Sequence, residues 1–193
     1  MAAAGGLFGP DLPHGFHYAP GFVSVEEEGR LAAAIAGIEF STFEMRGVVA
    51  RRRVAFFGAT YDAGAPAPQP MPEFLSDLRR RLAACARVEP AAFAMALINE
   101  YQPGSPIGWH RDAPQYDIVA GVSLLSSCRM RFRPYDKAGL AAAPRRRRVA
   151  THEVVLEPRS AYLMTGASRQ DYEHHIPAVS HLRYSITFRT LRR

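Results

Sequence analysis

The segment GWHRD places His110 and Asp112 two residues apart, just after the glycine- and proline-containing stretch YQPGSPIG. If the backbone is extended there, both side chains leave the same face and can reach one metal ion. An imidazole and a carboxylate are two of the three ligands of the 2-His-1-carboxylate triad, which leaves three positions of Fe(II) open. His174 or His175, much later in the chain, can supply the second imidazole. The pair HxD is frequent by chance, and a zinc hydrolase with His/Asp/His ligands is an open alternative.

A second group of polar side chains lies in the strand-like segment HLRYSITFRTLRR, where polar and apolar residues alternate. Its polar face consists of Arg183, Ser185, Thr187 and Arg189. The two arginines are roughly 20 Å apart along an extended strand and can lean together around a short dianion. Arginine suits carboxylates because its guanidinium forms paired hydrogen bonds with them. Asn99 and Tyr101 share a face of another predicted strand and can donate to the same anion.

Hydrophobic periodicity predicts the elements that must position these groups. Helical spacing predicts two helices, at residues 23–38, where Ser24 caps the first turn, and at residues 73–87. From Phe93 on the period changes to two, which predicts a succession of strands. These strands are residues 94–101, 118–126, 128–134, 148–156, 160–164 and 182–190. The pattern therefore predicts an α+β fold that is mainly β.

The remaining segments lack such a period. Residues 1–20 are predicted to form an irregular arm, and residues 64–72 a loop rich in proline, alanine and glycine. The run RRRVAFFGATYDA from Arg51 is basic, then aromatic and β-prone. The stretch from Pro134 to Arg148 is predicted to be a long hairpin loop that ends in four arginines. It is either a solvated turn or a phosphate contact.

Composition excludes several classes of protein. With 193 residues, 48% of them hydrophobic and 22% charged, the chain is neither disordered nor a disulfide scaffold, and one domain over residues 1–193 is expected. Cys85 and Cys128 lie among apolar neighbours and are expected in the core. There is no signal peptide pattern or membrane-spanning stretch, so a cytoplasmic protein is expected. No dimerisation heptad or long apolar stripe is visible, so a monomer is expected. The net charge of +6, with 23 arginines and one lysine, favours an anionic partner.

Three segments taken together resemble the AlkB-like 2-oxoglutarate- and Fe(II)-dependent dioxygenases. They are NEYQPGSPIGWHRD from Asn99, SAYLMTGASRQDYEHHIP from Ser160 and RYSITFRTLR from Arg183, in the order of that family. The resemblance covers about residues 50–192. It implies a double-stranded β-helix, or jelly roll, over residues 93–193, with the helices of residues 21–92 packed outside. It also implies Fe(II), 2-oxoglutarate and O2 as cofactors.

The resemblance also implies roles for individual residues. His110 and Asp112 match the first two iron ligands of the family, and His174 the third, because Tyr172, Ile176 and Pro177 supply the motif around it. Arg183, assisted by Tyr101, matches the partner of the far carboxylate of 2-oxoglutarate. Arg189 and Asn99 match the partners of its carboxylate and keto end at the metal.

The activity that the resemblance implies is oxidative demethylation of alkylated bases in DNA or RNA, with release of succinate, CO2 and formaldehyde. Candidate substrate contacts are Phe57 and Tyr61 in the lid-like segment, and Arg145, Arg146, Arg147 and Arg148 in the arginine loop. Phe56 and Phe57 are equally well explained as core aromatics of a strand. A dioxygenase acting on a protein side chain or a small molecule is an alternative, as is a non-catalytic nucleic-acid-binding module. The sequence leaves the nucleic acid and the base open.

Overall fold

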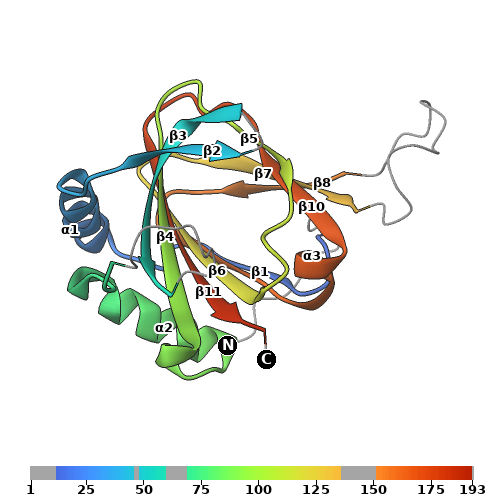
Figure 1. Ribbon diagram of the computed structural model, residues 1–193, viewed down its shortest axis with the longest axis horizontal. Coiled ribbons are helices and arrows are strands. Elements are labelled where there is room, and N and C mark those ends of the chain that lie inside the picture. Colours follow the sequence, from blue (N-terminus) through green and yellow to red (C-terminus); the bar gives the residue numbers. More distant parts are fainter. Residues whose placement is uncertain (1–11, 46–47, 60–68, 136–150, 193) are drawn as a thin grey trace.

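The structure is a computed structural model that describes residues 12–45, 48–59, 69–135 and 151–192. Two antiparallel β-sheets face each other, and the helices lie outside them (Figure 1). In chain order the elements are β1 (Phe16–Ala19), α1 (Val25–Ala36), β2 (Ser41–Met45), β3 (Val48–Gly58), a 3₁₀ turn (Glu73–Leu75), α2 (Ser76–Ala86), a 3₁₀ turn (Pro90–Ala92), β4 (Phe93–Tyr101), β5 (Ile107–His110), β6 (Tyr116–Leu124), β7 (Cys128–Pro134), β8 (His152–Leu156), β9 (Ser160–Met164), α3 (Gly166–Gln170), β10 (Tyr172–Ile176) and β11 (Arg183–Leu191).

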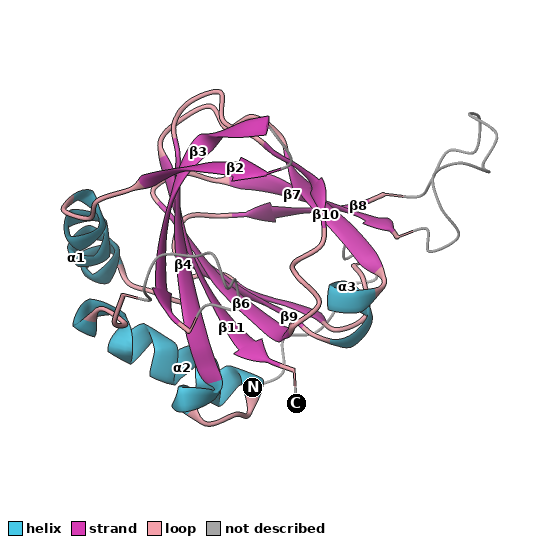
Figure 2. Cartoon of the chain, in the orientation of Figure 1, coloured by secondary structure: helices cyan, strands magenta, loops and turns pink. Residues whose placement is uncertain are grey.

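The larger sheet has seven strands in the order β1-β9-β6-β11-β4-β3-β2, and the smaller has four in the order β5-β10-β7-β8 (Figure 2). Strand β11 lies at the centre of the larger sheet, between β4 and β6. Apolar side chains from both sheets form a buried cluster between them, which includes Val119, Met130 and Phe132. This arrangement confirms the predicted mainly β, jelly-roll architecture.

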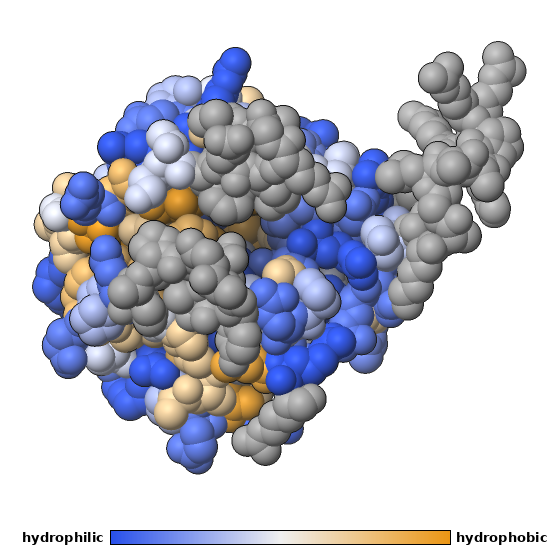
Figure 3. All heavy atoms as spheres, viewed as in Figure 1, coloured by the Kyte–Doolittle hydropathy of each residue, from blue (hydrophilic) through white to orange (hydrophobic). Residues whose placement is uncertain are grey.

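Helices α1 and α2 cover the outer face of the larger sheet. Ser24 begins α1 as predicted, because its hydroxyl accepts a hydrogen bond of 3.1 Å from the backbone N–H of Glu27. Leu31 and Ile35 of α1 belong to the same buried cluster as Leu78 of α2. Hydrophobic residues accordingly gather toward the α1 and α2 side of the face in Figure 3, whereas the β8 and β10 side is mainly hydrophilic.

The alternation of apolar and polar residues in β11 makes one face of the larger sheet apolar and the other polar at this strand. Tyr184, Ile186 and Phe188 pack into the cluster beneath the helices. The intervening residues of β11, including Arg183 and Arg189, therefore lie on the inner face, toward the smaller sheet. The segment whose pattern predicted an anion site is thus placed in the middle of the molecule.

Several elements differ from the prediction. The expected arm contains strand β1, which pairs with β9 from Phe16 opposite Met164 to Ala19 opposite Ala161. Strands β2, β5 and β10, of four or five residues each, were also not predicted. Cys128 is buried as expected, whereas Cys85 is exposed on α2. No helix in the described ranges is long and apolar enough to cross a membrane.

Candidate active site

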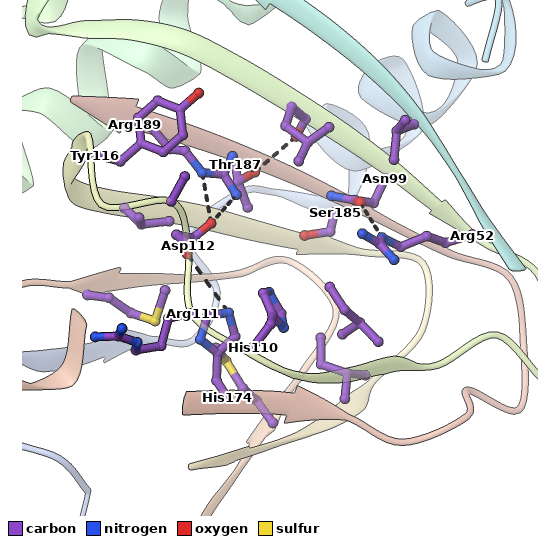
Figure 4. Close-up of a pocket in the computed structure, with 18 of the residues that line it drawn as sticks. Arg52, Asn99, His110, Arg111, Asp112, Tyr116, His174, Ser185, Thr187 and Arg189 are labelled. Carbon is purple, nitrogen blue, oxygen red and sulfur yellow. Dashed lines mark hydrogen bonds and ion pairs between the residues drawn. The ribbon is translucent and has the colours of Figure 1, made fainter. Parts of the chain in front are cut away.

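A cavity of about 230 Å³ lies between the two sheets. Inner-face side chains of β3, β4 and β11 form one wall, and side chains of β5, β10 and the loop after β5 form the other (Figure 4). The lining contains all the predicted metal and 2-oxoglutarate residues except Arg183, namely Asn99, Tyr101, His110, Asp112, His174 and Arg189. Residues from distant parts of the sequence therefore meet in one cavity.

The predicted metal-binding residues lie side by side. β5 ends at His110, and its antiparallel pairing with β10 sets His174 directly opposite His110. The two imidazole rings are 4.2 Å apart between centroids. Asp112 lies in the loop after β5 rather than on an extended strand, and one of its oxygens, Oδ2, is 3.9 Å from Nε2 of His174. His175, the alternative ligand, instead bonds through Nδ1 to the carbonyl of Ile107 at 2.7 Å.

The protonation states of this group suit metal ligation. Burial lowers the pKa of His174 to about 3 and also lowers the pKa of His110. Burial alone would raise the pKa of Asp112, but the charge and hydrogen bond of Arg189, together with the neighbouring His174 and His110, hold this pKa well below its usual range. Both imidazoles are therefore neutral and the carboxylate ionised at neutral pH, as metal ligands must be.

Neighbouring groups orient these ligands. His110 donates a hydrogen bond of 2.9 Å from Nδ1 to the carbonyl of Gly108, which leaves the lone pair on Nε2. Arg189 donates from Nε (3.0 Å) and Nη2 (2.7 Å) to Oδ1 of Asp112, which leaves Oδ2 toward His174. Within the described part of the chain, no three His, Cys, Asp or Glu side chains are closed into a metal site as they stand.

A buried cation, Arg183, lies beside Tyr101 of the cavity wall, although Arg183 is not itself among the residues that line the cavity. Arg183 is fully buried, and its Nε donates to the hydroxyl of Ser123 at 3.0 Å. Its Nη1 and Nη2 are buried without a hydrogen-bond partner, and its guanidinium lies 5.0 Å from the ring centroid of Tyr101. A buried cation with unsatisfied donors is costly unless an anion completes it. This arrangement fits one carboxylate of a small dicarboxylate.

Of the predicted substrate residues, the structure describes one, and it does not line the cavity. Phe57 is 5% exposed and packs in the cluster beneath the helices, so its prediction as a substrate contact is wrong. It pairs with Ala96 in the register of β3 and β4, whereas Phe56 pairs with Leu97 and lines the cavity. A shift of one position along a strand exchanges the two faces, which explains the error. Tyr61, Arg145, Arg146, Arg147 and Arg148 lie outside the described residues.

The sequence analysis did not predict Arg52 and Tyr162 as residues of the cavity. Arg52 lies on β3, is 9% exposed, and donates from Nε to Oδ1 of Asn99 at 3.1 Å. Tyr162 lies on β9 opposite Gly121 of β6, and burial raises its pKa. The signal for Arg52 is the alternation of Arg52, Val54 and Phe56, which becomes visible once the inner face of β3 is known.

Comparisons with known proteins agree with this geometry. The family model described as the 2OG-Fe(II) oxygenase superfamily matches residues 15–189. The "Alkylated DNA repair protein ALKBH8 homolog" of Arabidopsis thaliana is 26% identical over 181 residues, covering 84% of this chain and 51% of the relative. The chain thus spans about half the length of that curated relative.

Solved structures share the fold. OsALKBH1 has a TM-score of 0.66 at 16% identity, covering 91% of this chain and 98% of that one. A prolyl-4-hydroxylase of Pseudomonas putida has a TM-score of 0.62 at 15% identity, covering 93% and 94%. The α-ketoglutarate-dependent epimerase SnoN has a TM-score of 0.59 at 18% identity, covering 91% and 76%. Since the family model spans most of the sequence, this chain belongs to the 2OG-Fe(II) oxygenase superfamily, which implies Fe(II), 2-oxoglutarate and O2 as its cofactors.

Proposed function

We propose that this dioxygenase oxidatively demethylates alkylated bases in DNA or RNA. The observation that carries the proposal is the close group of His110, Asp112 and His174 in the lining of the cavity between the sheets. The name of the Arabidopsis relative, an alkylated DNA repair protein, supports the nucleic-acid substrate.

In this proposal His110, Asp112 and His174 hold Fe(II). Their donor set is that of the 2-His-1-carboxylate triad, and their protonation states at neutral pH are those that ligation needs. Arg189 holds one carboxylate oxygen of Asp112, so this residue is expected to ligate through the other oxygen alone. A single oxygen from Asp112 leaves coordination positions open for the co-substrates.

Arg183 and Arg189 are assigned to 2-oxoglutarate. The unsatisfied Nη1 and Nη2 of Arg183, beside Tyr101, suit the carboxylate far from the metal. Arg189 bonds to Asp112, Asn99 lines the same cavity, and both are assigned to the other end of 2-oxoglutarate. When bound, Fe(II) and 2-oxoglutarate supply, with O2, the oxidising power to hydroxylate a C–H bond, with succinate and CO2 as co-products.

The chain itself orients and shields the target. Leu97, Ile107 and Ile176 make much of the cavity wall apolar, which keeps water from the reacting group. Phe56 is 44% exposed and lines the cavity, where its ring can stack on a base turned out of its strand. A hydroxylated N-methyl group is unstable and leaves as formaldehyde, which restores the base. The net charge of +6 favours a polyanionic substrate.

The experiment measures two products of one reaction. Anaerobically purified protein is mixed with Fe(II), 2-oxoglutarate and ascorbate, exposed to air, and assayed for succinate and formaldehyde. The oligonucleotides carry single N-methylated bases, both cationic and neutral, beside unmethylated strands of the same sequence. Formaldehyde that appears with a methylated strand, and is lost in His110→Ala, is the expected result.

A different outcome would change the class of substrate assigned to the enzyme. If succinate forms but no methylated strand yields formaldehyde, the substrate is a protein side chain or a small molecule. The shared fold of the Pseudomonas putida prolyl-4-hydroxylase makes proline-containing peptides the next substrates to test.

A further inference from the structure

The short helix α3 contacts both of the segments that carry Asp112 and His174. It ends at Gln170, one residue before β10, which carries His174. Residues 111–115, here called the Asp112 loop, connect β5 to β6. Arg111 of this loop donates from Nη1 to the carbonyl of Gln170 at 3.1 Å. The position of α3 therefore relates one proposed metal ligand to the other.

Arg169 of α3 binds the Asp112 loop in return. It is buried, and its Nη2 donates to the carbonyl of Ala113 at 2.5 Å and to the carbonyl of Tyr116 at 3.0 Å. Ala113 directly follows Asp112, and Tyr116 is the first residue of β6. One nitrogen thus holds the middle and the end of the loop. The backbone beside Asp112 cannot shift unless these two hydrogen bonds break.

The helix that carries Arg169 is itself anchored by the N-terminal segment. Five residues form no stable helix alone, so α3 depends on such contacts. The backbone N–H and the hydroxyl of Thr165, the N-cap, donate to the carbonyl of Gly15 at 3.0 and 3.1 Å. The backbone N–H of Ser168 donates to the carbonyl of His14 at 2.9 Å. A Cβ atom at Gly15 would overlap the carbonyl oxygen of Thr165, so this close approach requires glycine.

The hydrogen bonds to the loop are what an arginine adds at position 169. Its Nε is buried and has no hydrogen-bond partner among the described residues, and burial lowers the pKa of the guanidinium. An apolar side chain of similar size would fill the same space without this cost. The bonds to Ala113 and Tyr116 are the gain that such a side chain would lack.

We propose that Arg169 is a positioning residue for metal binding, which fixes the Asp112 loop so that the carboxylate of Asp112 faces His174. Asp112 is then held in two places, because Arg189 of the larger sheet holds its Oδ1 and Arg169 holds the backbone beside it. Replacing a group that orients a metal ligand typically lowers metal affinity by about 10- to 100-fold. This inference rests on the metal site of the proposed function and is independent of the substrate.

Arg169 affects a bound metal ion in two ways that have opposite signs. Arg169 and Asp112 line one small cavity of about 250 Å³, so the guanidinium charge lies close to the metal ligands. Because like charges repel, loss of this charge alone would tighten the binding of a cation. Loss of the hydrogen bonds to the loop would weaken it. The direction of the change in affinity therefore distinguishes positioning from electrostatics.

The test measures the Kd of Mn²⁺ by calorimetry on metal-free protein, with Mn²⁺ in place of Fe²⁺ to avoid oxidation. Arg169→Met removes both the charge and the donors, and the Kd should rise about tenfold. Arg169→Lys keeps the charge and has three donors. Because a single nitrogen of Arg169 serves both carbonyls, the lysine should recover most of the affinity that methionine loses. A purely structural role would lower the free energy of unfolding in urea but leave the Kd unchanged.

Arg79→Met is the matched control. Arg79 lies on α2, outside the larger sheet, and donates from Nη2 to the carbonyl of Ala91 at 3.3 Å. Like Arg169, it has a buried Nε without a hydrogen-bond partner in the described part of the chain. Its replacement removes an arginine-to-carbonyl bond far from the metal ligands and should leave the Kd of Mn²⁺ unchanged.

The outcomes separate the role of Arg169 from the metal site itself. An unchanged or lower Kd in Arg169→Met would overturn the positioning role, as would a loss of affinity that Arg79→Met reproduces. If Arg169→Met does not fold, Arg169→Gln replaces it under the same prediction, since its shorter side chain also lacks the charge. Wild-type protein that binds no Mn²⁺ would overturn the metal site of the proposed function, and this inference with it.

Discussion

Arg183 is the largest of the fully buried side chains in the part of the chain that the structure describes. A guanidinium in such a position is normally paired, because removing a charge from water costs several kcal/mol. Only its Nε has a protein acceptor, and Nη1 and Nη2 have none. Since the family uses a dicarboxylate co-substrate, the residue is understood as half of an ion pair that the ligand completes.

Replacing Arg183 with Met should therefore weaken 2-oxoglutarate binding without harming the ligand-free fold. Loss of charged hydrogen bonds worth about 1.5–3 kcal/mol corresponds to a Kd that is roughly 10- to 100-fold higher. The free energy of unfolding without ligand should stay equal or rise, because an apolar side chain of similar size replaces an unpaired charge. Calorimetry and urea unfolding measure the two quantities. An unchanged Kd, with exposed Arg129→Met as the control, would contradict the assignment.

The burial of His174 predicts how the free energy of unfolding depends on pH. In the metal-free protein His174 does not bind a proton until about pH 3, whereas in the unfolded chain it does so near its ordinary pKa of about 6.5. The unfolded state thus binds more protons in this window, and stability falls as pH falls through it. Between pH 7 and 5.5 the contribution of His174 to the free energy of unfolding should drop by about 1 kcal/mol.

Urea unfolding of metal-free wild type and His174→Gln at the two pH values tests this prediction. The pH dependence of the variant should be smaller by about 1 kcal/mol, since glutamine does not titrate. The same slope in both proteins would show that His174 is not held neutral in the folded state.

At the scale of elements, the pairing of β6 with β9 determines the position of one residue that lines the cavity. Gly121 of β6 is opposite Tyr162 of β9, whose ring lies over the glycine and lines the cavity. A Cβ atom at Gly121 would be 2.3 Å from Cζ of Tyr162 and 2.6 Å from its hydroxyl. The absence of a side chain at Gly121 therefore sets the position of Tyr162.

Gly121→Ala should displace the Tyr162 ring and destabilise the protein by about 1–3 kcal/mol, as overpacked cores do. It should also weaken 2-oxoglutarate binding, because the ring moves within the cavity. Thermal unfolding and calorimetry measure both effects. Gly29→Ala is the control: Gly29 is exposed on α1 with no atom within 4 Å of an added Cβ, and should stabilise by about 0.5–1 kcal/mol. Equal effects of the two substitutions would contradict the packing argument.

At the scale of the whole molecule, the ligands are expected to join the two sheets. The proposed metal ligands come from β5, β10 and the loop after β5, whereas Arg183 and Arg189 come from the larger sheet. Binding therefore adds contacts across the interface between the sheets, and anything that binds only the folded state stabilises it.

At concentrations of about 100 times Kd, each ligand should add about 2.7 kcal/mol, which raises the Tm of a domain of this size by roughly 5–10 °C. Mn²⁺ replaces Fe²⁺ in the measurement to avoid oxidation, and EDTA should reverse its effect. His110→Ala should lose the shift from the metal, and Arg183→Met the shift from 2-oxoglutarate. A Tm that neither ligand changes would argue against binding at this site.

The sequence by itself determined the chemistry available to this protein. The spacing of His110 and Asp112 and the alternation of Arg183 and Arg189 are local patterns, and they identified the candidate metal and anion groups before any fold was known. The two main helices and most of the longer strands were predicted for the same reason, because periodicity reflects which face a residue presents.

Only the tertiary structure decided how these groups meet. The pairing of β5 with β10 brings His174 opposite His110, and no local pattern contains that pairing. The register of β3 places Arg52 and Phe56 in the cavity and Phe57 in the core, since a shift of one residue reverses both faces. Strand pairing is non-local and is fixed by the packing of the whole molecule, so it decides which side chains line the cavity.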